Sequence, residues 1–376
     1  MNYAPRPTWA EIDLSALRHN LLQASNLCSA GQRILAVVKA DAYGHGAVAV
    51  SRGLQSFGIK DFAVATLEEA LELRFAGIAD NLLVLGSCFP GQEAAFLEHN
   101  LMPTVLDPET ALRLNKVAVT RQQKLKVHLK VDSGMGRVGF LPTQLKNFLP
   151  QLRELKGLVI EGFMSHLACA DELSSGVTGV QQDQFRMMLQ MVREAGIQPR
   201  EVHLNNSAGL SGWDCPECTL SRPGIMLYGG FPGPDFSSKL DLRPVMHLRS
   251  CVAQLRQVPV GSGISYGHCY HAHDDMRVAV LPIGYADGYN RLFSNCGQGI
   301  LHGQKIPVIG RVCMDWIMLD VSHVSTVDVG DCVTLLGSAD GLSITGDDWA
   351  EQLETISYEV FCRIGSRVPR RYLSVS

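Results

Sequence analysis

Short apolar runs and helical patterns alternate along the first two-thirds of the chain, and this alternation constrains the fold more than any other feature. Eight runs read as strands, in order ILAVVK, DFAVAT, NLLVLG, LMPTVLD, LKVHLKVD, LVIEGFMSH, EVHLNN and TLSRPG. Between most of them, apolar residues recur at three- and four-residue steps, as in LEEALELRFAG and QDQFRMMLQMVREAG, which predicts helices. Strand then helix, repeated in this way, predicts an α/β fold with a (β/α)8 TIM barrel. A doubly wound open sheet is the alternative, and eight units in a row favour the barrel.

The character of the sequence changes after Gly233-Pro234. From about Leu242 to Leu336, strand-like runs separated by turns follow one another, including MHLRSCVAQL, MRVAVLPIG, KIPVIGRV, WIMLDV and CVTLLG, with one late helical segment around WAEQLETISYEVFCRIG. At 376 residues the chain is long enough for two domains. We therefore predict a barrel domain at residues 1–240 and a mainly β C-terminal domain at residues 241–376, with 232–234 as the boundary candidate.

The charge of the chain argues against nucleic acid or a membrane surface as a binding partner. The formal net charge is −4 and the pI about 6.3, with no run of like charges. The start MNYAPRPTWAEIDL has neither the basic region nor the apolar core of a signal peptide, so we expect a cytoplasmic protein. Eleven scattered cysteines favour reduced thiols, and the single CxxC, Cys215 with Cys218, reads as accidental.

The ends of the predicted strands are unusually polar. They carry Lys39, Lys130 with Asp132 and later Arg137, His166, Asn205 with Ser207, and Arg222. In a barrel the functional residues lie at the carboxyl ends of the strands, so these side chains should meet. A lysine that a strand delivers into a cleft can form a Schiff base, because desolvation frees its amine. Taken alone, Lys39 is better interpreted as an ion-pair partner of Asp41 or as a residue that simply ends a strand.

GMGRVG, residues 134–139, follows a strand and matches the dinucleotide-binding pattern G-x-G-x-x-G. Pro142 interrupts the segment where the phosphate-binding helix of that motif should run. The context therefore argues against a dinucleotide site.

A cluster of histidines and acids, His268, His271 and His273 with Asp274 and Asp275, could suggest a metal site. No second cluster completes it, and its position directly after GISYG indicates a polar loop. We predict no metal.

VVKADAYGHG resembles the lysine signature of the alanine racemase family, whose fold-type III members hold pyridoxal 5′-phosphate on that lysine. KVDSGMGRVGF, HLNNSAG, SRPGIMLYG, GISYG, GRVCMDW and SYEVFCRIGSRVPR also look like family motifs, in the family's order, so the resemblance covers nearly the full length. It implies a barrel followed by a mainly β domain, which agrees with the pattern above. It also implies an isomerase that interconverts L- and D-alanine through a pyridoxal-phosphate external aldimine and supplies D-alanine for peptidoglycan, or catabolises it.

The resemblance also implies roles for individual residues. Those that hold the cofactor are Lys39, Tyr43, Ser207, Arg222, Gly224, Ile225 and Tyr358, with Arg222 directed at the pyridine nitrogen. Lys39 is one of two acid-base groups, and Tyr266 from the partner subunit is the other, assisted by His166. A homodimer follows, since each site needs the partner's C-terminal domain.

The same resemblance assigns the substrate's contacts. Arg137 binds the substrate carboxylate, while Met314 and Asp315 of the other subunit close the pocket. Lys130 matches a lysine that many family members carry as a carbamate, which would turn a cation into an anion beside Arg137.

Three alternatives remain open from the sequence. A decarboxylase of similar architecture usually has a Cys-Asp pair where this chain has Cys313-Met314-Asp315, and an acidic residue in place of Arg222. A non-enzymatic pyridoxal-phosphate-binding regulator resembles the barrel alone, and the second domain argues against it. A racemase that prefers serine would use nearly the same residues, because a small pocket rejects one extra hydroxyl poorly.

Overall fold

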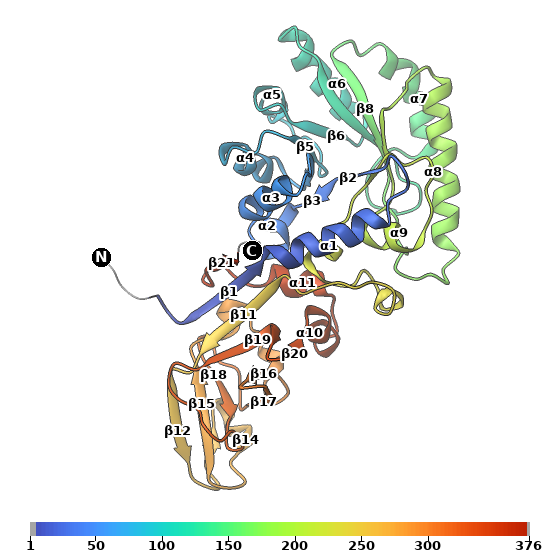
Figure 1. The fold of residues 1–376 in the computed structure, drawn as a ribbon. Helices are drawn as coiled ribbons and strands as arrows, with labels where there is room; N and C mark the ends of the chain where they lie inside the picture. The colour runs from blue at the N-terminus through green and yellow to red at the C-terminus, as the bar shows by residue number, and fades with distance from the viewer. Residues whose placement is uncertain (1–4, 374–376) are drawn as a thin grey trace.

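In the computed structural model, which describes residues 5–373, the chain forms two lobes of different architecture (Figure 1). The upper lobe is a parallel barrel surrounded by helices, and the lower lobe is mainly antiparallel sheet. The predicted fold class is confirmed.

The barrel has eight parallel strands, the first of which is interrupted at Leu35 into β2 and β3. They are β2 (Arg33–Ile34) with β3 (Ala36–Val37), β4 (Asp61–Val64), β5 (Asn81–Val84), β6 (Met102–Val105), β7 (Leu125–Lys130), β8 (Leu158–Met164), β9 (Glu201–His203) and β10 (Leu220–Ser221). The circle closes between its first and last strands, where Leu35 N–H donates to Ser221 O at 2.8 Å. All four residues of β4 are buried, which explains why such strands read as unbroken apolar runs.

Helices surround the barrel, and most of them follow its strands as the sequence pattern predicts. They are α1 (Leu14–Asn26), α2 (Lys39–Gly44), α3 (Ala47–Ser56), α4 (Leu67–Phe75), α5 (Glu93–Glu98), α6 (Pro108–Thr120), α7 (Pro142–Arg153), α8 (Val177–Glu194) and α9 (Ser207–Gly212). Local caps set several starts: Thr66 and Glu69 form a capping box on α4, and the Asp107 side chain accepts from Thr110 N–H on α6.

The second lobe is built on a ten-stranded sheet in the order β12-β15-β18-β17-β16-β19-β11-β1-β21, with β20 beside β19. Its strands are β1 (Thr8–Asp13), β11 (Met246–Cys251), β12 (Gln254–Val258), β15 (Met276–Leu281), β16 (Gln298–Leu301), β17 (Gln304–Ile309), β18 (Ile317–Asp320), β19 (Cys332–Ala339), β20 (Leu342–Ile344) and β21 (Arg370–Leu373); β13 (Gly263–Ile264) and β14 (Tyr270–His271) form a separate hairpin. The predicted single late helix is instead two, α10 (Gly346–Gln352) and α11 (Ser357–Cys362). Glu354 between them takes a φ of 52°, which ends the right-handed turn.

The first strand belongs to the sheet of the second lobe. The sequence assigns Thr8–Asp13 to the barrel domain, but β1 pairs antiparallel with β11 and parallel with β21. The hydroxyls of Thr8 and Ser250, both fully buried, are 2.8 Å apart at one end of this pairing. The first and last strands, β1 and β21, therefore lie side by side between the lobes (Figure 1).

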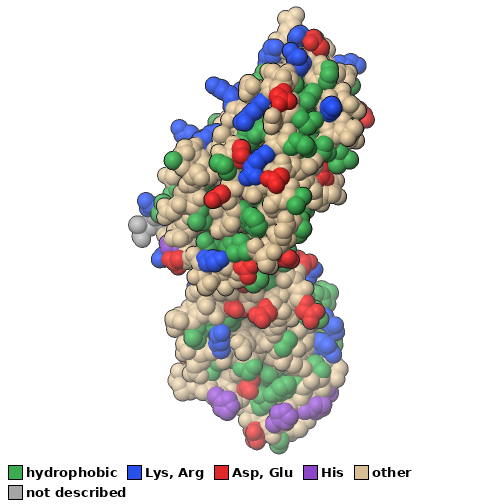
Figure 2. All heavy atoms as spheres, turned by 90° about the vertical axis from the view of Figure 1, so that its right-hand side faces the viewer, with side chains coloured by type: hydrophobic (Ala, Val, Ile, Leu, Met, Phe, Trp, Pro, Cys, Tyr) green, Lys and Arg blue, Asp and Glu red, His purple; other side chains and the backbone are tan. Residues whose placement is uncertain are grey.

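The space-filling view shows the two lobes meeting at a narrower waist, with histidines gathered at the far end of the second lobe (Figure 2). Among residues 5–373, no three His, Cys, Asp or Glu side chains are arranged to hold a metal ion. Within the same range, none of the helices has the length and apolar character needed to span a bilayer. Cys215 and Cys218 are joined as a disulfide, which differs from the reduced thiols that the sequence favours.

Candidate active site

A cavity of about 400 Å³ opens at the carboxyl ends of the barrel strands. The predicted site residues that line it are Lys39, Tyr43, Lys130, Arg137, His166, Ser207, Arg222, Gly224, Ile225 and Tyr358. A larger cavity, of about 690 Å³, lies at the opposite end beside Arg33 and Asp61. Because barrel chemistry is built at the carboxyl ends of strands, the smaller cavity is the candidate site.

The segment after Lys39 is one turn of left-handed helix, which sequence patterns do not predict. Residues 40–43 all have φ between 52° and 54°, a conformation that costs roughly 1–2 kcal/mol per L-residue. Hydrogen bonds from outside the turn hold it: Ala40 N–H donates to Glu69 Oε1 at 2.7 Å, and Arg370 Nη2 donates to Gly44 O at 2.8 Å. The Asp41 carboxylate accepts from Ala47 N–H at 2.7 Å, so it caps α3. The turn sets Lys39 at the mouth of the cavity.

His45 ends this turn as a fully buried residue between the rings of Tyr228 and Phe361, 4.7 Å and 5.2 Å from them. Burial lowers its pKa to about 4, although Nδ1 also lies within hydrogen-bonding distance of the Tyr43 and Ala42 carbonyls, which raise it. A depressed histidine pKa adds stability that is complete above the unfolded value of about 6.5 and is lost as the pH falls toward 4. Between pH 7 and pH 5 we expect His45 alone to cost about 2 kcal/mol of unfolding free energy.

Urea unfolding at the two pH values checks this. His45→Phe keeps an aromatic ring in the same place and cannot titrate, so its loss of stability between pH 7 and pH 5 should be smaller by that amount. Equal losses in the two proteins would contradict the assignment.

Four cationic side chains line the cavity: Lys39, Lys130, Arg137 and Arg222. Burial, together with the charges of Arg137 and Arg222, lowers the pKa of Lys39, and Glu69 only partly opposes them. Burial and the charges of the same two arginines and Lys39 lower the pKa of Lys130 to about 8. Such a concentration of positive charge favours ligands that carry several negative charges.

Asp132, at the end of β7, does not neutralise these cations directly. Its Oδ1 accepts from the N–H groups of Gly134, Met135 and Gly136 at 2.8–3.1 Å, and its Oδ2 accepts from Arg137 N–H at 3.1 Å. Burial would raise the pKa of Asp132, but these four N–H groups lower it below its usual value. The N–H groups of residues 134–137 are thus engaged with a carboxylate of their own chain, and α7 begins at Pro142 rather than being interrupted by it.

A second group of residues forms a small polar cradle where the late barrel strands end. Ser207 Oγ accepts from Gly224 N–H at 2.9 Å. A Cβ on Gly224 would lie 2.4 Å from Tyr43 Oη, so only glycine fits here. Within residues 5–373, Ile225 N–H has no backbone acceptor outside its own helical turn. A hydroxyl, a free N–H and no obstructing side chain suit a phosphate group.

Arg222 is held by neutral acceptors. Its exposure is 3%, and its Nη2 donates to Ser165 O at 2.8 Å and to Leu204 O at 2.9 Å. Its Nη1 lies 2.8 Å from His203 Nδ1, and Nη2 lies 3.2 Å from His166 Nδ1. Burial lowers the pKa of Arg222 to about 9, which still leaves it protonated at neutral pH. The two hydrogens of Nη2 are shared among three acceptors, of which His166 Nδ1 is the most distant. Because a guanidinium can only donate, both Nδ1 atoms face it with their lone pairs, and the ring protons lie on Nε2.

Burial and the charge of Arg222 lower the pKa of both His166 and His203 well below the usual value, so both rings are neutral. His203 Nε2–H then donates to His128 Nδ1 at 2.8 Å, and His128 Nε2 lies 3.3 Å from Glu201 Oε2. This row of side chains runs from Arg222 down through the barrel interior.

Sequence reasoning missed His128 and His203. The signal was present, since each is a polar residue inside a predicted buried strand, LKVHLKVD and EVHLNN. Gly162 on the neighbouring strand was a further sign, because a Cβ there would lie 2.2 Å from His128 Nδ1. A glycine in a buried strand often marks such a close approach.

The remaining predicted residues, Tyr266, Met314 and Asp315, lie in the second lobe. Tyr266 begins the short 3-10 helix η3 (Tyr266–His268) and lines a separate cavity of about 590 Å³ with Cys313. The exposed fractions are 71% for Tyr266 and 51% for Met314, which are large for apolar side chains. A single chain does not bring these residues to the cavity that Lys39 lines.

Comparisons with known proteins cover both lobes. The family model described as "Alanine racemase, N-terminal domain" matches residues 12–232, and "Alanine racemase, C-terminal domain" matches residues 245–372. The interval between the matches contains the division proposed at 240/241, which stays a prediction. The chain is 46% identical over 375 residues to the alanine racemase of Geobacter sulfurreducens, with 99% of this chain and 98% of that relative covered. The alanine racemase of Halothermothrix orenii is 43% identical, with 98% and 97% covered.

Solved structures give the same result. The alanine racemase of Clostridium difficile 630 superposes with a TM-score of 0.91 at 39% identity, covering 98% of this chain and 96% of that one. The alanine racemase of Bacillus anthracis with bound L-Ala-P has a TM-score of 0.92 at 34% identity, covering 99% and 96%.

Proposed function

The chain belongs to the alanine racemase family of pyridoxal 5′-phosphate-dependent isomerases, and from this premise we propose that Lys39 of one subunit and Tyr266 of a second subunit exchange the α-proton of alanine. The observation that carries the proposal is the separation of the two groups. Lys39 lies in a cavity rich in cations, whereas Tyr266 is exposed on another lobe of the same chain. A homodimer in which the second lobe of each subunit covers the barrel of the other would complete both sites.

The cavity fits the cofactor of this family. Ser207, Gly224 and Ile225 would hold its phosphate, with the hydroxyls of Tyr43 and Tyr358 on the same wall. Arg222 would face its ring nitrogen as a fixed cation, and this disfavours protonation of that nitrogen. When bound, the cofactor withdraws electrons from the α-carbon of the amino acid and makes the α-proton removable.

The protein's own groups then hold the moving proton. The lowered pKa of Lys39 favours the neutral amine at Nζ, the form that can take the proton on one face. His166 accepts from Arg222 at Nδ1 and so carries its proton on Nε2, where it can donate to the phenolate of Tyr266. That hydrogen bond would stabilise the phenolate of Tyr266, the form that acts as the base on the other face.

The substrate carboxylate would be fixed from two sides. Arg137 supplies a cation at the cavity wall. Met314 of the other subunit supplies a backbone N–H that has no backbone acceptor within residues 5–373. Orientation by an arginine and an N–H would keep the α-hydrogen directed at Lys39 or Tyr266.

Incubation with L-alanine in D2O, followed by chirality and α-deuterium measurements, tests this function. We expect loss of optical activity and deuterium in both enantiomers. L-serine in a parallel reaction tests the serine alternative. A yellow protein that leaves alanine chirally intact would mean that the cofactor cavity is right and the reaction is wrong.

We also propose that Lys130 carries a carbamate. A pKa of about 8 gives it a useful fraction of neutral amine, the form that adds CO2 and releases one proton. The resulting anion would offset part of the charge of Arg137 and Arg222. Carbon-13 NMR with labelled bicarbonate should show one carbamate signal that is absent from Lys130→Ala, and the kcat/KM of that variant should fall about tenfold.

The matched control for the carbamate is Lys126→Ala, because Lys126 lies on the same strand with its side chain 57% exposed. This variant should keep both the signal and the activity. A wild-type spectrum identical to that of Lys130→Ala would refute the carbamate.

A further inference from the structure

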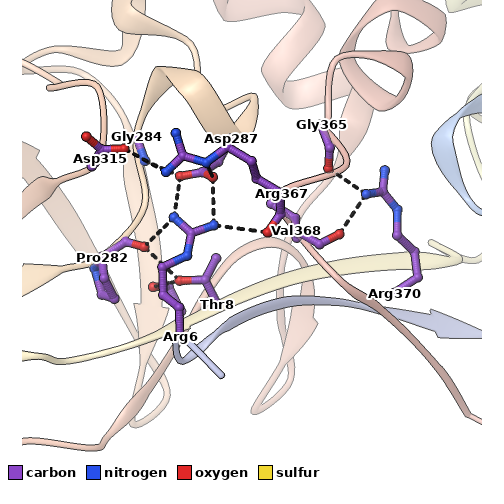
Figure 3. Close-up of polar contacts among 11 residues, drawn as sticks. Arg6, Thr8, Pro282, Gly284, Asp287, Asp315, Gly365, Arg367, Val368 and Arg370 are labelled. Carbon is purple, nitrogen blue, oxygen red and sulfur yellow. Dashed lines mark hydrogen bonds and ion pairs between the residues drawn. The ribbon is translucent and has the colours of Figure 1, made fainter. Parts of the chain in front are cut away.

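Asp287 is a fully buried carboxylate of the second lobe, and it contacts arginines from the first and last segments of the described chain, Arg6 and Arg367 (Figure 3). Asp287 accepts two hydrogen bonds from Arg6, at 2.8 Å and 2.7 Å. It also accepts from Gly284 N–H at 3.0 Å, and its Oδ1 lies 3.3 Å from Arg367 Nε. A carboxylate without solvent needs such partners, and Arg6 alone supplies a complete bidentate pair.

Arg367 also forms a second ion pair, with a carboxylate that is not buried. Its Nη2 donates to Asp315 Oδ1 at 2.6 Å. The side chains of Arg367 and Asp315 are 47% and 45% exposed, so this contact lies at the surface (Figure 3). Arg367 therefore bridges an anchored carboxylate, Asp287, to a half-exposed one that directly follows Met314.

The turn that carries Met314 packs against the turn that Asp287 caps. Tyr285 N–H donates to Cys313 O at 3.0 Å, and Ala286 N–H donates to Met314 O at 3.1 Å. A Cβ on Gly284 would lie 2.3 Å from the Met314 oxygen, so only glycine allows this approach. These contacts fix one side of the backbone of the Met314 turn.

The same turn is connected to Tyr266. Cys313 Sγ lies 3.3 Å from the hydroxyl of Ser265, the residue before Tyr266. That hydroxyl also donates to Arg311 O at 2.7 Å. The two parts of the second lobe that the proposed function places over the neighbouring barrel thus form one connected surface.

We propose that Arg367 is a positioning residue that acts in trans: by bridging Asp287 and Asp315, it holds the Met314–Asp315 turn for the active site of the neighbouring subunit. The proposal rests on the shared site proposed above. Arg367 touches neither the cavity that Lys39 lines nor the reacting atoms, so its effect is exerted through the orientation of the Met314 N–H. Loss of the bridge should weaken the binding of the substrate carboxylate and leave the proton-transfer groups in place.

Arg367→Met tests the bridge, because it keeps a long unbranched side chain and removes both ion pairs. Asp287 remains paired with Arg6 and Gly284 N–H, so we expect a folded dimer. The KM for alanine should rise about tenfold while kcat changes less than about threefold, the pattern of lost uniform binding. Asp315→Asn breaks the outer pair alone and should reproduce much of the KM increase, and Arg367→Lys should restore part of the affinity.

The matched control is Arg363→Met, which removes another half-exposed arginine whose partner is Glu359, four residues away. It should leave KM unchanged. A merely structural role for Arg367 would lower the melting temperature or the folded fraction without raising KM, and that result would overturn the proposal.

Mixed dimers separate action in trans from action within one subunit. In a dimer of Arg367→Met with Lys39→Ala, the one barrel that has Lys39 faces a second lobe with Arg367 intact, and we expect a wild-type KM. In a dimer of wild type with the double variant Lys39→Ala/Arg367→Met, the working barrel faces the altered lobe, and we expect the raised KM. If KM instead follows the barrel's own subunit, the proposal is wrong.

The reference pair for these mixtures is Lys39→Ala with Tyr266→Phe. Activity in this mixed dimer supports the shared site independently of Arg367. If the reference pair is inactive, the shared site itself fails. If it is active and the KM in the Arg367 mixtures does not follow the facing lobe, only the role of Arg367 fails.

Discussion

Replacing Lys39 by alanine is expected to lower the rate of alanine racemisation by about 10⁴-fold or more. The change removes both the amine that would bond to the cofactor and the base on one face of the substrate. The left-handed turn that follows is held by Glu69 and Arg370 through backbone atoms, so the variant should fold. Chirality and α-deuterium in D2O give the rate, and the absorbance of the bound cofactor reports the covalent bond separately.

The matched control for this prediction is Lys60→Ala, since Lys60 is an exposed lysine just before β4. It should match the wild type in both measurements. Cofactor that still binds without its covalent bond, together with lost racemisation, is the expected result for Lys39→Ala. Undiminished deuterium exchange in Lys39→Ala would show that another group is the base.

The barrel could be predicted from the sequence because its signals are local. Each strand is a short apolar run, and the signal for a helix start, such as Thr66 with Glu69, lies within four consecutive residues. The polar strand ends at Lys39, His166 and Arg222 could be grouped by the barrel geometry alone, before any resemblance was considered.

Other features could not be predicted because distant contacts decide them. The left-handed turn at residues 40–43 opposes the intrinsic preference of its residues, and bonds to residues distant in sequence, Glu69 and Arg370, help to stabilise it. The pairing of β1 with β11 and β21 likewise depends on strands more than 230 residues away. His128 was overlooked because LKVHLKVD alternates apolar and polar residues, so the histidine fits the strand pattern without standing out.

The residues of the second lobe illustrate a different limit. No pattern in GISYG or CMDW indicates whether Tyr266 and Met314 act within their own chain or on a second one, and their exposure in the folded chain is what supports the proposed shared site. The pair between Arg367 and Asp315 joins residues 52 apart in sequence. The role proposed for this ion pair depends on Asp287, and the sequence does not reveal that this carboxylate is buried.

Replacing Tyr266 by phenylalanine is expected to lower racemisation by about 10²- to 10⁴-fold, the usual loss for one acid-base group. Phenylalanine keeps the ring and removes only the hydroxyl, and the residue is 71% exposed in the chain, so folding should be unaffected. Lys39 remains able to remove and return a proton on its own face. Deuterium should therefore still enter one enantiomer of alanine, while inversion to the other is lost.

Mixed dimers then decide where Tyr266 acts. Lys39→Ala and Tyr266→Phe each have two damaged sites as homodimers, but their mixed dimer contains one site with both groups intact and one with neither. We expect it to recover about half of the wild-type activity per dimer, because a two-fold dimer has two equivalent sites. Tagging the two subunits differently and purifying on each tag in turn yields the mixed dimer free of homodimers. If Tyr266 acted within its own subunit, each site of the mixed dimer would lack one group, and the mixed dimer would be inactive. Activity of the mixed dimer would therefore support a site built from two chains.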